Sequence, residues 1–194
     1  SLTEISGSIT DIKNAYNSTS ITGLDTLAID LSGESISAND LNGLDNKTNS
    51  KITATVKETD IATLKTLTNR NNNNNYTIKI DNSSVNPDDL KIIYDSFPLC
   101  RIDASSIKTV KGSVEEINNL YTNLPPVYSW SHGLFIKGLG NEDFILPLEN
   151  TSNNFEASDL IELQNQTTGS IILEPIESWN GNVKITGSIT NIKN

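Results

Sequence analysis

The chain has 194 residues, of which 35% are hydrophobic and only 6% aromatic, and its formal net charge is −10. The basic residues form no run, which argues against a nucleic-acid partner, because phosphate binding needs clustered Lys and Arg. No apolar stretch approaches the roughly 20 residues that span a bilayer, so we expect no membrane insertion. The low aromatic content favours a thin core spread over repeated units.

Cys100 is the only cysteine, so the chain cannot form an intramolecular disulfide. It lies in the alternating segment "CRIDA", which predicts a small buried side chain. The sequence contains no methionine and no signal peptide. We therefore expect a processed product or a piece of a longer protein.

The chain opens with "ISGSITDIKN" at 5–14 and closes with the similar "ITGSITNIKN" at 185–194. Each copy joins an apolar residue and a Gly-Ser pair to a capped helix, and "VKGSVEEINN" at 110–119 has the same form. This repetition is typical of a repeat protein, whose units bury their apolar faces against one another.

Four short segments alternate apolar and polar residues as half-buried strands do. They begin at Leu27, Lys51, Tyr76 and Cys100, at spacings of 24, 25 and 24 residues, and further candidates begin at Phe144 and Ser170. Helix starts recur between them. Ser8 with Asp11, Ser37 with Asp40 and Ser113 with Glu116 have capping-box spacing, and Asn86-Pro87 is another start.

A strand and a short helix in about 24 residues predict a right-handed β-α solenoid with a parallel sheet on one face. Its architecture is analogous to that of leucine-rich repeats, but their sequence signature is absent. We expect regular coils over 1–122, an irregular insertion loop over 123–143 and further coils over 144–194. The asparagine run at 69–76 is expected to be a flexible loop.

The interruption at 123–143 contains the Pro pair and the only histidine. Insertions in repeat proteins often lie on the binding face, although an edge cap or a structural loop is the other interpretation. The candidate ligand-contact surface consists of Tyr128, Trp130, His132, Phe135 and Trp179.

Catalytic and metal-binding patterns are weak. His132 has no nucleophile elbow nearby, and zinc would need three or four His or Cys ligands. Carboxylate pairs such as Asp88/Asp89 and Glu115/Glu116 occur at predicted helix starts, where the helix dipole explains them. We expect no enzyme and no cofactor. Calcium is possible, with "GNED" at 140–143 as a candidate loop, but no ligand set can be named.

The segments "SITDIKNAYNSTSITGLDTLAIDLSGESISANDLNGLDNKT" and "CRIDASSIKTVKGSVEEINNLYTN" resemble repeats of very large surface or secreted proteins of marine bacteria, especially picocyanobacteria. The resemblance covers residues 1–122 and returns at 185–194. Such proteins are grouped with adhesins and hemolysin-like exoproteins. The resemblance implies an extracellular or cell-surface location and transfers no catalytic residue.

We therefore expect a non-enzymatic structural or adhesive segment of a long extracellular protein or surface fibre. Its expected partners are neighbouring copies or repeats, stacked end to end, and surface glycans are a further candidate. The alternative is a carbohydrate- or receptor-binding module that uses the aromatic residues of 123–143. Exposure of Trp130 and Trp179 would favour the alternative, and their burial the structural role.

Overall fold

The computed structural model describes residues 2–124, 135–148, 153–175 and 181–187. They fall into two compact units. The first contains residues 2–82, 92–105 and 135–137, and the second contains 83–91, 106–124 and the described residues from 138 onward. The chain therefore enters each unit several times.

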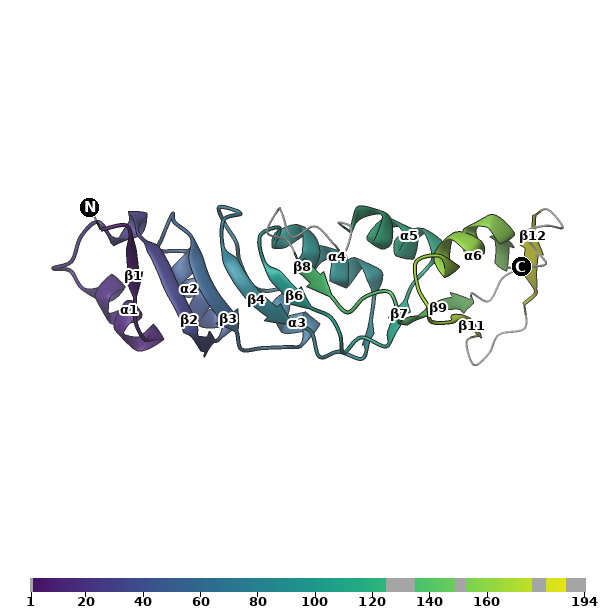
Figure 1. Cartoon of the computed structure of the whole chain (residues 1–194), viewed down its shortest axis with the longest axis horizontal. Coiled ribbons are helices and arrows are strands. Elements are labelled where there is room, and N and C mark those ends of the chain that lie inside the picture. The colour runs from purple at the N-terminus through teal and green to yellow at the C-terminus, as the bar shows by residue number, and fades with distance from the viewer. Residues whose placement is uncertain (1, 125–134, 149–152, 176–180, 188–194) are drawn as a thin grey trace. The chain divides into compact units, whose positions relative to one another are not determined.

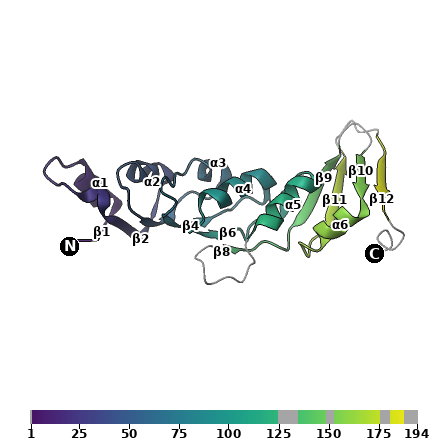
Figure 2. The same ribbon diagram turned by 90° about the horizontal axis from the view of Figure 1, so that it is seen from above.

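The first unit is built on a six-stranded parallel sheet with the order β1-β2-β3-β4-β6-β8 (Figure 1). Its strands are β1 (Glu4–Ser6), β2 (Ala28–Ile36), β3 (Ile52–Val56), β4 (Asn75–Lys79), β6 (Arg101–Asp103) and β8 (Phe135–Lys137). The short helices α1 (Ile9–Asn17), α2 (Ala38–Asp45) and α3 (Ile61–Leu64) lie on the same face of this sheet (Figure 2). A 3-10 turn, η1 (Leu24–Thr26), precedes β2.

Local capping explains where these helices begin. Ser8 and Ser37 accept hydrogen bonds from the backbone N–H groups of Asp11 and Asp40, as their spacing predicts. Helix α3 begins after Asp60, whose Oδ1 accepts from the N–H of Thr63 at 2.8 Å. Each cap satisfies a backbone donor that has no partner within the helix.

The core of the first unit lies between the sheet and its helices. Strand β3 is buried at every second position, and Tyr76 and Ile78 of β4 are fully buried. The helices contribute Leu41 and Leu64. The ring of Tyr76 packs against that of Phe97, with the centroids 6.0 Å apart. Alternation along the strands therefore sets which side chains enter the core.

The second unit contains two further parallel sheets. One has the order β11-β9-β7-β5, and the other pairs β10 with β12. Their strands are β5 (Ser84–Val85), β7 (Thr109–Lys111), β9 (Asp143–Leu148), β10 (Asn153–Glu156), β11 (Ile171–Pro175) and β12 (Val183–Thr186). The unit also holds α5 (Val114–Asn123) and α6 (Ala157–Gln164), and the boundary between the units passes through α4 (Pro87–Ser96).

The predicted β-α solenoid with one parallel sheet is wrong. The α/β class and the parallel pairing are observed, but the strands divide among three sheets. From β4 to β9 the chain alternates between two of these sheets, so strands that follow one another in sequence are not paired. A uniform 24-residue coil does not describe this topology.

Two aspartate turns of the same local form lie in different places in the first sheet. In β2, Asp30 Oδ1 accepts from the N–H of Ser32 at 2.9 Å beside the register shift between Leu31 and Ser35, and β2 still pairs with β3 beyond it. After β6, Asp103 Oδ1 accepts from the N–H of Ser105 at 3.0 Å, and here the strand ends. The next extended segment, β7, joins another sheet. Such turns compete locally with strand pairing.

Candidate functional site

The predicted aromatic surface lies almost wholly outside the described residues. Tyr128, Trp130, His132 and Trp179 are not described, and Phe135 is described only as the first backbone position of β8. The ligand-contact surface therefore stays a prediction. The structure draws attention to other parts of the chain.

The carboxylate pairs have structural surroundings. Asp88 and Asp89 lie in the first turn of α4, and Glu116 completes a capping box with Ser113 at the start of α5. Among the described residues, no group of three or more His, Cys, Asp or Glu side chains could hold a metal ion. Calcium thus stays a prediction. No described helix is long and apolar enough to cross a membrane.

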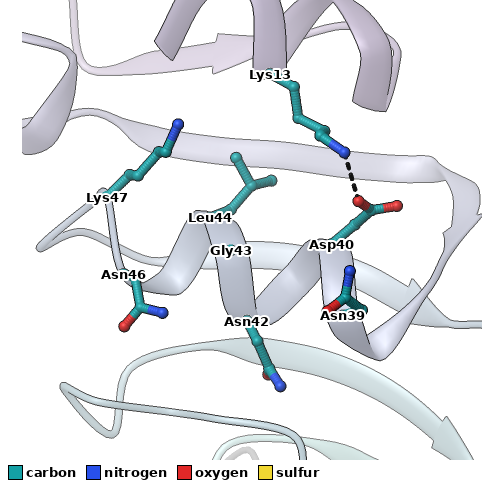
Figure 3. A pocket seen from close by; sticks show the side chains of 8 residues that line it. All are labelled: Lys13, Asn39, Asp40, Asn42, Gly43, Leu44, Asn46 and Lys47. Carbon is teal, nitrogen blue, oxygen red and sulfur yellow. Dashed lines mark hydrogen bonds and ion pairs between the residues drawn. The ribbon is translucent and has the colours of Figure 1, made fainter. Parts of the chain in front are cut away.

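A hollow of about 340 Å³ opens beside α2 in the first unit (Figure 3). We call it the α2 groove, and it is lined by Lys13, Asn39, Asp40, Asn42, Gly43, Leu44, Asn46 and Lys47. The side chain of Lys13 extends from α1 toward Asp40 (Figure 3). The side chain of Asn42 points away from Lys13. Amides and ammonium groups could bind hydroxyl or carboxylate groups of a polar ligand.

The charged groups of the α2 groove are already used to join two helices. Lys13 Nζ donates to Asp40 Oδ1 at 2.6 Å, and Lys47 Nζ donates to Asn17 Oδ1. The hydrogen bond from Lys13 is the main cause that lowers the pKa of Asp40 below its ordinary value. Because both partners of this ion pair are partly exposed, its contribution to stability is small. The groove thus fits a helix-to-helix contact at least as well as a ligand site.

A second polar cluster of the first unit surrounds Asp45, the last residue of α2, which is only 2% exposed. Its Oδ2 accepts from Thr68 Oγ1 at 2.7 Å and from the N–H of Arg70 at 3.1 Å. Its Oδ1 accepts from Asn74 Nδ2 at 2.8 Å. A buried carboxylate is stable only when donors satisfy it in this way.

Side-chain amides extend these contacts to neighbouring segments. Asn74 is fully buried, and its Oδ1 accepts from the N–H of Ile52 at 2.9 Å. Asn69 accepts from the N–H of Asn74 and donates to the carbonyl of Ser96. Asn42 donates to the carbonyl of Thr66 and accepts from the N–H of Thr68. We call the set the Asp45 network: Asn42, Asp45, Thr68, Asn69, Arg70 and Asn74.

The Asp45 network adds buried contacts to the asparagine run, which forms a turn before β4. The predicted loop is present over residues 69–74, and its flexibility stays a prediction. Within it, Asn74 is buried, and the Asn69 side chain bonds to Asn74 and Ser96. The side-chain amides of Asn74 and Asn69 bond to the N–H of Ile52 and to the carbonyl of Ser96. They thus take the place of a neighbouring strand as hydrogen-bond partners for these backbone groups. Asparagine suits this role since its amide both donates and accepts.

Cys100 is fully buried, as its apolar surroundings predict. Its sulfur accepts from the N–H of Tyr76 at 3.2 Å and lies 3.5 Å from the carbonyl oxygen of Asn74. Burial raises the pKa of the Cys100 thiol to about 12. The thiol is therefore protonated at neutral pH, and its surroundings are structural.

In the second unit, Glu142 of the "GNED" segment is only 1% exposed. Its Oε2 accepts from the N–H groups of Gly140 and Asn141 at 2.7 and 2.9 Å. Among the described residues, no hydrogen-bond partner faces its Oε1. Burial raises the pKa of Glu142 above the ordinary value of 4.5, against the opposing effect of these backbone donors.

We expect Glu142 to make the second unit less stable as the pH rises. Because its folded-state pKa is raised, the folded protein holds this proton more tightly than the unfolded chain does. The stabilisation is complete below the ordinary pKa of 4.5 and is lost as the pH rises through the folded-state value. Urea denaturation from about pH 4 to about pH 7 should therefore show wild type losing stability relative to Glu142→Gln. A pH-independent difference between the two proteins would contradict this expectation, and Glu115→Gln is the exposed control.

Sequence reasoning missed both Asp45 and the buried state of Glu142. One signal for Asp45 was present, because an acidic residue in the last turn of a helix is disfavoured by the helix dipole. No pattern in the sequence singled out Glu142 as buried. Comparisons with protein-family models, with curated proteins and with solved structures find no match for this chain.

Proposed function

We propose that this chain is a non-enzymatic structural or adhesive module of a secreted or cell-surface protein. The observation that carries the proposal is the Asp45 network, which joins backbone and side-chain groups 22 to 29 residues apart in the sequence. Such bonds tie successive strand-helix segments to one another. A module that transmits force benefits from them, because several segments must then separate together.

Other features support the same role. The charged groups of the α2 groove join α1 to α2, and the first-turn carboxylates of α4 and α5 stabilise helix starts. The net charge of −10 keeps the surface well solvated. The resemblance to repeats of large bacterial surface proteins also favours an extracellular location. Glycan binding by the aromatic residues of 123–143 stays the alternative prediction.

The proposal is tested by stretching single molecules held at both termini. We expect wild type to unfold with resolved force peaks, and Asn42→Ala to lower the force at which the first unit opens. Asn42 bonds to Thr66 and Thr68, and their contacts are lost in the variant. Asn46→Ala is the matched control, because Asn46 is exposed and lies one helical turn later.

Two results would contradict the structural role. Extension of the wild-type chain without a resolved force peak would show that the module does not bear load. Equal unfolding forces for Asn42→Ala and Asn46→Ala would show that the Asp45 network does not carry the force. Far-UV circular dichroism establishes beforehand that both variants fold.

A further inference from the structure

In the described part of the chain, two edge strands, one in each unit, have one unpaired backbone edge. Strand β12 pairs only with β10 among the described residues, and β1 pairs only with β2. Apolar side chains at these edges are exposed, with 45% exposure for Ile185 and 70% for Leu2. An open edge of this kind is a template for pairing with another strand.

The two edge strands have similar short sequences. Residues 183–188 read "VKITGS", and residues 3–8 read "TEISGS". Gly187 and Gly7 end the two strands with φ values of 150° and 151°. The backbone therefore has the same φ directly after each of the two strands.

Backbone directions decide which registers are possible. The N–H of Asn153 donates to the carbonyl of Asn182, so Val183 and Ile185 direct their own backbone groups away from β10. The N–H of Ala28 donates to the carbonyl of Thr3, so Glu4 and Ser6 direct theirs away from β2. In a parallel pair, a residue that faces the partner strand lies opposite one that faces away from it. Placing Ile185 opposite Ile5 meets this condition.

We propose that β12 of one copy pairs in parallel with β1 of a second copy, with Ile185 opposite Ile5 and Lys184 opposite Glu4. This inference rests on the proposed structural role and names its partner as a copy of the same chain. In this register the N–H of Ile185 donates to the carbonyl of Glu4, and the N–H of Ser6 donates to the carbonyl of Ile185. The N–H of Glu4 donates to the carbonyl of Val183.

The charges of Lys184 and Glu4 favour this register over registers shifted by one or two residues. Lys184 and Glu4 are opposite charges directly across the pair, which stabilises cross-strand pairing. A shift by one residue reverses the backbone directions and sends each side chain to the wrong face. A shift by two residues places Lys184 opposite Ser6 or Leu2 and removes the ion pair.

The apolar faces also become continuous. Within its own sheet Ile185 lies opposite Phe155, whereas Ile5 lies opposite Ile29, which in turn lies opposite the buried Ile52. Pairing β12 with β1 would place Phe155 and Ile185 in line with Ile5, Ile29 and Ile52, so that the apolar side chains form one continuous row across the joined sheets. Burial of Ile185 and of the half-buried Ile5 then supplies the hydrophobic contribution.

The contact joins different surfaces of the two copies. Each added copy therefore offers a new β12 edge and a new β1 edge, and association is open-ended unless the geometry closes a ring. We expect the mean mass to rise with protein concentration.

Charge reversal tests the pairing. Lys184→Glu places two acidic residues opposite each other, and Glu4→Lys places two lysines there. The dissociation constant of each variant should be about tenfold higher than that of wild type. The attraction between Lys184 and Glu4 is lost, and a repulsion between like charges replaces it. The double variant, which exchanges the two charges, should associate as wild type does, and so should an equimolar mixture of the single variants. Lys57→Glu, at an exposed position outside both edges, is the control for net charge.

Sedimentation velocity over a range of concentrations measures the association. Hydrogen exchange gives a second measurement that needs no variant, because assembly should protect the N–H groups of Ile185, Glu4 and Ser6. The inference is overturned if wild type stays monomeric, if Lys184→Glu behaves as Lys57→Glu does, or if the double variant fails to recover. The force measurement on Asn42→Ala and Asn46→Ala is independent of these outcomes, so failure of the pairing and failure of the structural role are distinguishable.

Discussion

Replacing Asp45 with alanine should lower the free energy of unfolding of the first unit by about 3 to 4 kcal/mol. The variant leaves three buried or partly buried donors without their acceptor: Thr68 Oγ1, the N–H of Arg70 and Asn74 Nδ2. Hydrogen bonds to a charged group are among the stronger ones, and a buried donor without a partner adds a desolvation cost. Urea denaturation followed by circular dichroism measures the loss.

Asp25→Ala is the matched control, because Asp25 is an exposed aspartate of the same unit. It should change the stability by less than about 0.5 kcal/mol. Asp45→Asn should fall between the two, since its amide retains one acceptor oxygen of similar shape. Equal effects of Asp45→Ala and Asp25→Ala would show that the Asp45 network does not stabilise the fold. Hydrogen exchange at the N–H of Ile52, which bonds to Asn74, localises the effect.

Gly169→Ala should destabilise the second unit by about 3 kcal/mol. A Cβ atom at Gly169 would lie 2.3 Å from the carbonyl oxygen of Glu142 and 2.9 Å from the backbone nitrogen of Asp143. Both contacts are with backbone, so the two segments must move apart. That movement would break the bonds from Thr167 Oγ1 to the Glu142 carbonyl and from the N–H of Ser170 to Asp143. Thermal and urea denaturation measure the effect.

Gly43→Ala is the control, because it is the same substitution but should change the stability in the opposite direction. Gly43 lies inside α2, and a Cβ atom there meets nothing within 4 Å. Alanine should stabilise the helix by about 1 kcal/mol, because glycine has the lower helix propensity. A neutral Gly169→Ala would contradict the close approach of residues 142–143 and 169.

The helix starts could be read directly from the sequence. Ser8, Ser37 and Ser113 cap the helices that their spacing predicts, and α4 begins at Pro87. These signals are local, since the cap and the N–H that it accepts from are three residues apart. The strand periodicity likewise placed Ile52, Tyr76 and Ile102 in buried strands.

The candidate sites were less accessible to sequence analysis. The aromatic set of Tyr128, Trp130, His132, Phe135 and Trp179 stays a prediction, because the structure does not describe those side chains. Asp45 and Asn74 are 29 residues apart in the sequence. Their contact depends on how α2 and the start of β4 approach each other in space, and no local pattern encodes that approach.

The sequence by itself determined the class of local elements, their approximate period, their caps and the matching phrases that begin within β1 and within β12. These follow from interactions within a few residues and from apolar periodicity. Only the tertiary structure decided that the strands form three sheets instead of one, and that an asparagine run supplies buried hydrogen bonds. The physical reason is that strand pairing joins segments far apart in the sequence, such as β6 and β8, whereas aspartate turns of the same local form occur inside β2 at Asp30 and at the end of β6 at Asp103. A local turn signal therefore does not decide which sheet the next strand joins.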